Sequence, residues 1–75
     1  MNIGVPKESK HGERRVALLP SAVAALAAPG ARVLVESGAG IGVGADDDAY
    51  RNAGASIVTT DEAWRADLVA KVTES

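Results

Sequence analysis

Two cations, Arg15 and Lys71, are the side chains of this 75-residue chain that apolar segments could hold in a fixed position. Arg15 ends the polar run 6–15 and is followed at once by the apolar segment 16–19, which tends to be buried. Lys71 interrupts the apolar run 68–72, where an ammonium group needs a partner or a cleft. A guanidinium offers two parallel donors to a carboxylate or phosphate. Together the two cations indicate a site for a small anion, such as the carboxylate and carbonyl of a keto acid.

Both cations also have simpler explanations. Arg15 could form an ion pair with Glu8 or Glu13, and Lys71 could extend into solvent from an edge strand. His11 lies in the most polar stretch and is more typical of a solvated loop histidine than of a general base. Two further lysines are typical of surface charges: Lys7 and Lys10. Because no Ser/His/Asp set and no metal-ligand spacing is present, we expect neither a catalytic residue nor a metal site in this chain.

The two cations can meet only if the segments that carry them belong to one sheet. Four short apolar runs are typical of strands: 2–5, 31–35, 55–58 and 67–72. Three helices are expected between these strands. The first begins at Pro20, carries Val23, Leu26 and Ala27 on one stripe and ends at Pro29-Gly30. The second is capped at Asp46–Asp48 and runs through Asn52 to Gly54, and the third covers 62–65 and is capped by Asp61. This alternation predicts an α/β fold with an open parallel sheet, flanking helices and right-handed crossovers. In such a sheet, Arg15 and Lys71 would lie at one rim, at the carboxyl ends of the strands.

A glycine-rich loop gives a second candidate. Residues 40–45 formally match the pattern G-x-G-x-x-[GA], and Asp61 lies near the end of the next strand, as in a dinucleotide-binding fingerprint. However, residues 36–39 separate the glycines from the preceding strand, and residues 46–48 place three aspartates where phosphates would sit. We therefore expect a turn followed by capping acids and no cofactor-binding residue in this loop.

The composition is that of a soluble globular piece, with 47% hydrophobic and 24% charged residues and a net charge of −2. This balance does not favour binding to nucleic acid or to an anionic membrane. The absence of cysteine fits a reducing compartment, and no stretch resembles a membrane span or a signal peptide, so we expect a cytoplasmic protein. A core with no Phe, one Trp and one Tyr is thin, which suggests that a neighbour covers one face and that the natural domain extends beyond Ser75.

Five ordered segments, spaced along essentially the whole chain, resemble the N-terminal part of the alanine dehydrogenase and pyridine nucleotide transhydrogenase family: 3–8, 13–20, 35–40, 53–55 and 66–72. The resemblance implies a flavodoxin- or Rossmann-like domain that is incomplete in residues 1–75. It also implies that NAD(H) binds to a second, Rossmann domain absent from this chain. The 75 residues alone are therefore expected to be inactive.

The resemblance also implies roles for single residues. The positions that hold pyruvate in alanine dehydrogenases are matched by Arg15, on the carboxylate, and by Lys71, near the keto oxygen. The catalytic histidine of the dehydrogenases would lie beyond Ser75, and His11 does not match it. The family further implies a homo-oligomer.

Within the family, two activities are open. The segments Gly12–Arg15 and Leu19-Pro20 are closer to the transhydrogenase alpha subunit. That subunit implies hydride transfer between NAD(H) and NADP(H), from NADH to NADP⁺ on a partner component, coupled to proton translocation in a complex with membrane-embedded subunits. The alternating glycines Gly40, Gly42 and Gly44 are closer to alanine dehydrogenase, which deaminates L-alanine to pyruvate with NAD. We predict the transhydrogenase, with alanine dehydrogenase as the alternative. A third possibility is a truncated, non-catalytic module that binds another chain through its uncovered face.

Overall fold

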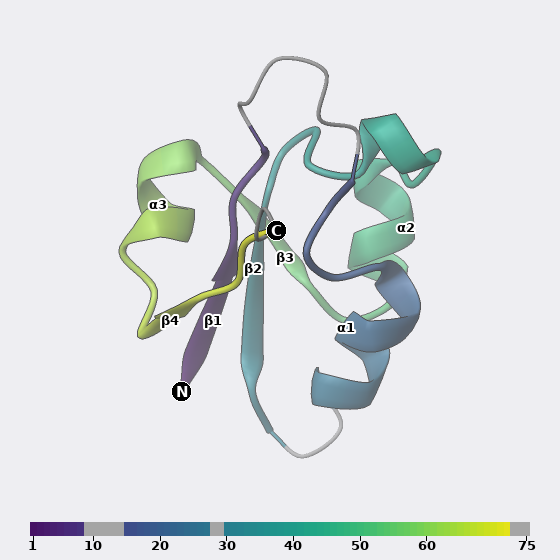
Figure 1. Ribbon diagram of the computed structural model, residues 1–75. Helices are drawn as coiled ribbons and strands as arrows, with labels where there is room; N and C mark the ends of the chain where they lie inside the picture. Colours follow the sequence, from purple (N-terminus) through teal and green to yellow (C-terminus); the bar gives the residue numbers. More distant parts are fainter. Residues whose placement is uncertain (9–14, 28–29, 73–75) are drawn as a thin grey trace.

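A parallel sheet forms the centre of the computed structural model, which describes residues 1–8, 15–27 and 30–72 (Figure 1). In the described residues the strands lie in the order β3-β2-β1-β4, with these bounds: β1 (Asn2–Val5), β2 (Arg32–Glu36), β3 (Ser56–Val58) and β4 (Leu68–Val69). Every pairing between neighbouring strands is parallel. The predicted α/β fold with an open parallel sheet is thereby confirmed.

Helices cover both faces of this sheet. The helical segments are α1 (Pro20–Ala27), the short 3₁₀ helix η1 (Ile41–Val43), α2 (Asp47–Asn52) and α3 (Thr60–Trp64). Helices α1 and α2 lie on one side of the sheet and α3 lies on the other (Figure 1). On the α3 side, β1 approaches the helix at Gly4, where an added Cβ would overlap the backbone oxygen of Ala63. The absence of a side chain at this position therefore allows α3 to pack directly on the sheet.

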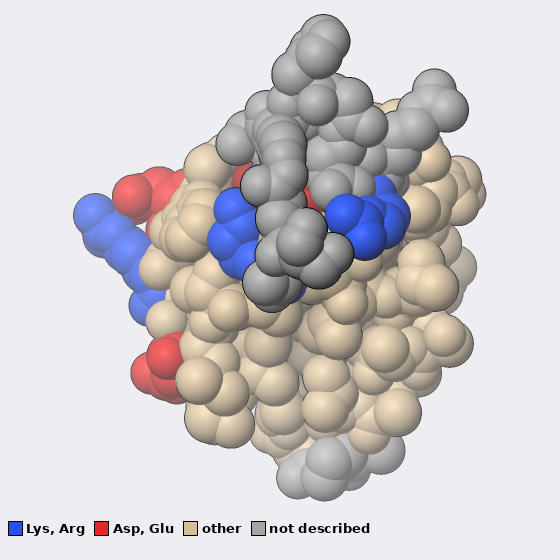
Figure 2. Space-filling model, viewed as in Figure 1, with Lys and Arg blue, Asp and Glu red and all other residues tan. Residues whose placement is uncertain are grey.

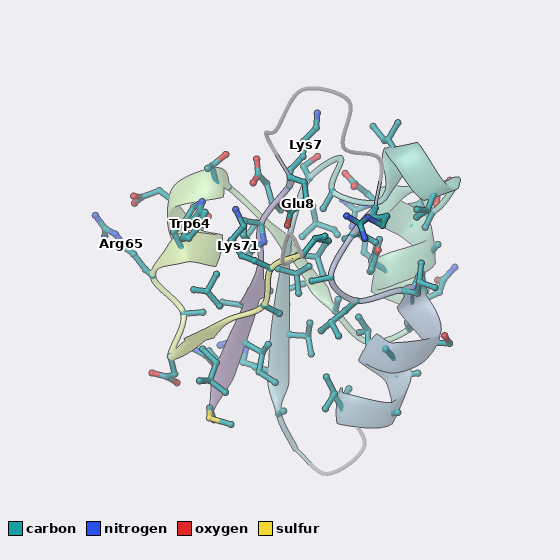
Figure 3. All side chains as sticks on the ribbon, in the orientation of Figure 1. Lys7, Glu8, Trp64, Arg65 and Lys71 are labelled. Atoms are coloured by element: carbon teal, nitrogen blue, oxygen red, sulfur yellow. The ribbon has the colours of Figure 1, made fainter. Side chains whose placement is uncertain are left out.

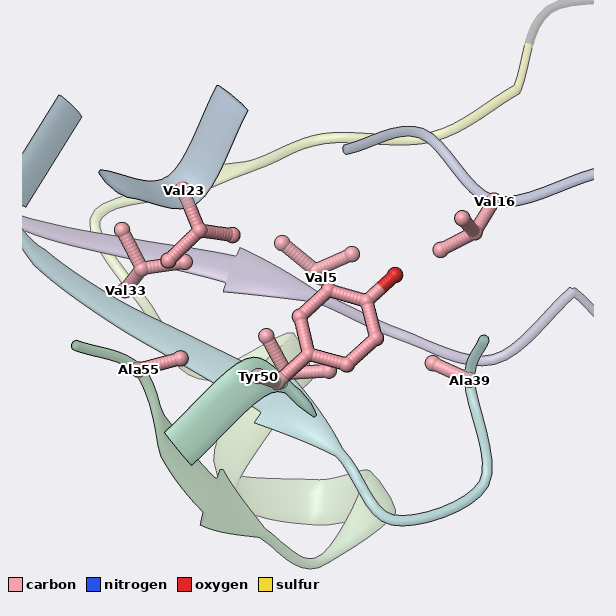
Figure 4. Packing of buried hydrophobic residues seen from close by; sticks show 8 residues of the cluster. Val5, Val16, Val23, Val33, Ala39, Tyr50 and Ala55 are labelled. Atoms are coloured by element: carbon pink, nitrogen blue, oxygen red, sulfur yellow. The ribbon is translucent and has the colours of Figure 1, made fainter. Parts of the chain in front are cut away.

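The hydrophobic core lies between the sheet and the α1 and α2 side (Figure 4). Its fully buried side chains come from β1, α1, β2 and α2: Val5, Val23, Val33, Val35 and Tyr50. Val33 and Val35 point to the same side because side chains alternate along a strand. In the described residues, the buried cluster is thus built from valine and alanine around one tyrosine.

The first two helices begin where the sequence predicts. Helix α1 starts at Pro20, and its stripe is buried at Val23 and partly buried at Leu26. Pro29 lies outside the described residues, so its part in ending α1 is untested. Helix α2 is capped by Asp46, whose side chain accepts the backbone N–H of Ala49 at 2.9 Å.

The predicted cap of α3 is wrong. Thr59, rather than Asp61, is the N-cap: its side chain accepts the backbone N–H of Glu62, and the Glu62 carboxylate accepts the N–H of Thr59 in return. This reciprocal pair is a capping box, which satisfies two backbone donors at once. Asp61 lies in the first turn instead and forms an exposed ion pair with Arg65.

The last strand is much shorter than predicted, and Lys71 lies beyond it. Continuing the register Ile3–Leu68 and Gly4–Val69 would place Lys71 opposite Pro6. Because proline has no N–H, the ladder cannot extend there. At the other end, the carboxylate of Asp67 accepts the N–H of Asn2 at 2.8 Å, so a side chain takes the place of a strand pairing.

Candidate functional site

The strand order reverses between β1 and β4. The chain passes from β1 to β2 to β3 in one direction along the sheet and then crosses to β4 on the other side of β1. The flanking helices change face at the same point (Figure 1). In open α/β sheets, ligands bind in the crevice at the carboxyl ends of the strands where the order reverses. Here the segments that leave β1 and β4, residues 6–8 and 70–72, meet at Glu8, and the region around Glu8 is termed the crevice.

Glu8 joins these two segments. One carboxylate oxygen, Oε1, lies 3.7 Å from Nζ of Lys71, and the other, Oε2, accepts the backbone N–H of Val72 at 3.1 Å. The Glu8 side chain is only 7% exposed, whereas that of Lys71 is 38% exposed. Figure 3 shows the two side chains meeting at the carboxyl end of the sheet. The crevice therefore contains a nearly buried carboxylate and a cation that solvent can still reach.

Trp64 provides a second contact to the same cation. The Nζ atom of Lys71 lies 5.0 Å from the centre of the Trp64 ring, in a cation–π contact from the end of α3 (Figure 3). Such contacts contribute about 0.5–1 kcal/mol at exposed sites. The ammonium group is thus held by a carboxylate from the loop after β1 and by a ring from α3.

Arg15 lies in a separate hollow that also reaches Glu8. This cavity of about 90 Å³ is lined by Lys7, Glu8, Arg15 and the glycine loop at 38–42. Arg15 itself is exposed, but Val16, the next residue, is 9% exposed and packs in the core. As predicted, the guanidinium is attached to a buried segment, although that segment reaches the surface again at Leu19, which is 49% exposed.

Glu36 lines a second cleft, next to the crevice, and forms hydrogen bonds with two other residues of its lining. Its carboxylate, at the end of β2, accepts the backbone N–H of Lys7 at 2.8 Å and the hydroxyl of Thr60 at 2.6 Å. These bonds fasten the loop after β1 to the start of α3. A cleft of about 520 Å³ opens between them, lined by Lys7, Glu8, Glu36, Thr60 and Trp64.

The structure brings the two predicted cations to the same end of the sheet, each beside Glu8. Arg15 shares its cavity with Glu8, and Lys71 forms an ion pair with it. In the space-filling view, two separate patches of Lys and Arg atoms lie in the upper half of the face, and further ones lie at its left edge (Figure 2). The proposed ion pair of Arg15 with Glu13 is untested, because Glu13 lies outside the described residues, as do His11 and Lys10. Substrate binding by Arg15 and Lys71 stays a prediction.

The glycine loop is closed by its own hydrogen bonds. The carboxylate of Asp47 accepts the N–H of Gly38 at 2.9 Å and the hydroxyl of Ser37 at 2.6 Å. The Gly38 N–H, followed by the Ser37 hydroxyl, holds the pKa of Asp47 below its ordinary value. The Gly38 N–H is therefore already occupied by a carboxylate and is not available to a phosphate.

The same loop has no room for a pyrophosphate at its central glycine. A Cβ on Gly40 would overlap the backbone oxygen of Ala45 and the ring of Tyr50, so this glycine serves internal packing. The adjacent hollow is lined by three aspartates and one arginine, which makes it unfavourable for an anion: Asp46, Asp47, Asp48 and Arg51. These residues do not fit a dinucleotide, and the absence of a cofactor-binding residue from this loop stays a prediction.

Residues 1–8, 15–27 and 30–72 contain no group of three or more His, Cys, Asp or Glu side chains that could hold a metal ion. In that same part of the chain, no helix is both long and apolar enough to cross a membrane.

Two residues of the crevice are not evident from the sequence as members of a site. Glu8 is recognisable there only as a possible partner of Arg15, whereas in the structure it pairs with Lys71. Trp64 carries no signal beyond being the single tryptophan of the chain. The register between β1 and β4 is what reveals both, because it brings the ends of these strands together beneath α3.

Known proteins share this arrangement over the whole chain. The model of the family described as alanine dehydrogenase/PNT, N-terminal domain, matches residues 4–75. An alanine dehydrogenase of Bacillus subtilis (strain 168) is 52% identical over 75 residues, which cover 99% of this chain and 20% of that protein. The chain thus spans about a fifth of the length of the curated relatives it matches.

Two solved structures extend the comparison to the backbone. An L-alanine dehydrogenase superposes with a TM-score of 0.95 at 47% sequence identity, over 100% of this chain and 21% of the other. A transhydrogenase from Sinorhizobium meliloti superposes with a TM-score of 0.89 at 38% identity, over 95% of this chain and 21% of the other.

Proposed function

Because the chain belongs to the alanine dehydrogenase/PNT family, we propose that it forms the substrate-binding part of an NAD-dependent alanine dehydrogenase, with Arg15 and Lys71 as the residues that bind pyruvate. The observation that supports this most is the position of both cations beside Glu8, at the crevice where the strand order reverses. Among the solved structures, the identity of 47% to an L-alanine dehydrogenase, against 38% to the transhydrogenase, favours this activity over the one predicted from the sequence.

The chemistry of the two side chains suits a 2-oxo acid. A guanidinium binds a carboxylate through two parallel hydrogen bonds, which fixes the orientation of the acid. An ammonium group beside the keto oxygen polarises the carbonyl and stabilises the negative charge that develops on that oxygen when ammonia adds to the carbon.

The nicotinamide cofactor, which supplies hydride chemistry in this family, would bind outside the described residues. The glycine loop does not fit a pyrophosphate, since Asp47 occupies the N–H of Gly38 and Gly40 is closed by packing. Residues of this chain would therefore orient the keto acid without holding the cofactor.

The transhydrogenase is a second candidate, favoured by the sequence Gly12–Arg15 and by the backbone match to the Sinorhizobium meliloti protein. One experiment separates the two. The complete gene product that carries this chain is assayed for oxidation of NADH with pyruvate and ammonium, and separately for binding of NADH and of pyruvate. Alanine dehydrogenase predicts the first activity. NADH binding with no response to pyruvate would instead support the transhydrogenase.

A further inference from the structure

Glu8 is the charged side chain of the crevice whose surroundings are most constrained. Only 7% of its side chain is exposed, and each of its two oxygens has a partner in the segment after β4. A buried carboxylate is costly unless it is paired and hydrogen-bonded, so the position of this group is tightly specified. Glu8 and Val72 are 64 positions apart in the chain. The contact therefore connects the two sides of the crevice.

The two bonds of Glu8 act on different parts of the same segment. The bond to the N–H of Val72 fixes the backbone next to Lys71, and the ion pair at 3.7 Å draws the Lys71 ammonium toward the carboxylate. The ring of Trp64, 5.0 Å from the ammonium, restricts it from another direction. Since 38% of the Lys71 side chain remains exposed, the ammonium group can still meet a ligand.

We propose that Glu8 is a positioning residue that, together with the ring of Trp64, orients Lys71 toward the keto oxygen of the substrate. The inference rests on the proposed function, because it concerns how the predicted pyruvate site is organised. Glu8 does not touch the substrate in this scheme. It acts through Lys71, by preventing a long and otherwise mobile side chain from adopting other rotamers when the substrate binds.

Two substitutions separate the bonds of Glu8. Glu8→Gln keeps an oxygen that can accept the N–H of Val72 but removes the negative charge, whereas Glu8→Ala removes both bonds. In hydrogen exchange, the amide of Val72 is expected to stay protected in Glu8→Gln and to exchange faster in Glu8→Ala. Protection of the Val72 amide in Glu8→Gln therefore reports on the bond between residue 8 and the Val72 N–H without any measurement of activity.

The ligand test is a double-mutant cycle on the complete gene product, with pyruvate as the ligand and its Kd and KM as readouts. Interacting residues show coupling of about 0.5–3 kcal/mol, so Glu8→Gln is expected to raise the Kd and the KM for pyruvate by about tenfold. In the Lys71→Met background, Glu8→Gln is expected to change neither value. Trp64→Leu is expected to raise both by a smaller factor, and Trp64→Phe, which keeps a ring, by less again.

The outcomes distinguish the inference from the function on which it rests. If Lys71→Met leaves pyruvate binding unchanged, the pyruvate site itself is wrong and the role of Glu8 falls with it. If Lys71→Met weakens binding while Glu8→Gln does not, the site stands and the positioning role is overturned. The positioning role is also overturned if Glu8→Gln weakens pyruvate binding equally in the unmodified protein and in the Lys71→Met variant. Arg65→Gln is the control, because Arg65 points away from the crevice and pairs with Asp61 on the surface (Figure 3).

Discussion

The hydroxyl of Tyr50 donates a hydrogen bond of 2.8 Å to the backbone oxygen of Leu18, which joins α2 to the segment that carries Arg15. The Tyr50 side chain is fully buried, and burial raises the pKa of its hydroxyl above the ordinary value. The group therefore stays protonated and continues to donate across the neutral pH range. One core residue thus supports both the packing of α2 and the path of the chain toward the crevice.

Tyr50→Phe is expected to lower the free energy of unfolding by about 0.5–1.5 kcal/mol, because it removes a hydrogen bond and leaves the Leu18 oxygen without this donor. Tyr50→Ala also creates a cavity and is expected to cost about 3–5 kcal/mol. Urea denaturation of both variants measures the two values. Equal stability of Tyr50→Phe and the unmodified protein would show that the bond contributes nothing.

Thr59→Ala is expected to destabilise the protein by about 1 kcal/mol, since it removes the side chain that caps α3 and leaves the N–H of Glu62 without its acceptor. Asp61→Asn should have a smaller effect, within about 0.5 kcal/mol, because its ion pair with Arg65 is exposed. Thermal or urea unfolding of the two variants compares them directly. A larger loss for Asp61→Asn than for Thr59→Ala would contradict the assignment of the cap.

Gly4→Ala is expected to lower the free energy of unfolding by about 3 kcal/mol or more, because the new methyl group would overlap the backbone oxygen of Ala63 and force α3 away from the sheet. Gly44→Ala is the matched control: Gly44 has a φ of +80° but open space around it, so only backbone strain of about 1 kcal/mol is added. The difference in unfolding midpoint between the variants measures the steric term. Similar losses at both positions would argue against close packing of α3.

Asp47 is expected to make the stability depend on acid pH. Its pKa in the folded protein lies below the unfolded value of 3.8, so its contribution is fully present above that value and is lost as the pH falls through the folded pKa. Because the Asp47 side chain is still partly exposed to solvent, the contribution should stay below about 1 kcal/mol. Melting temperatures of the unmodified protein and Asp47→Asn, measured from pH 7 to pH 2, should converge at the acid end. A constant gap between them would show that ionisation of Asp47 is irrelevant.

Much of the fold follows from the sequence, because local signals agree with the tertiary arrangement. Pro20 and Asp46 mark the starts of α1 and α2, and the apolar runs between helices predict parallel strands. The cap of α3 was also encoded, since Thr59 and Glu62 have the spacing of a capping box, but the neighbouring Asp61 is an equally good cap by residue type. A local pattern cannot decide between two such candidates when tertiary contacts make the choice.

The site was less predictable, because its contacts depend on register. Lys71 looks like a strand residue in the sequence, and only its alignment opposite Pro6 shows why the strand must end before it. The pairing of Lys71 with Glu8 depends on the same register. Residue types alone identify the two cations of the crevice but not the carboxylate that lies between their segments.

The claim that Arg15 and Lys71 form a keto-acid site is tested most directly by titrating pyruvate onto the complete gene product and its variants. Each substitution removes a charge-assisted hydrogen bond worth about 1.5–3 kcal/mol, so Arg15→Ala and Lys71→Met should each raise the Kd for pyruvate by at least about tenfold. The control Arg65→Gln should bind as the unmodified protein does. Unchanged pyruvate binding in both crevice variants, with the protein folded, would contradict the account.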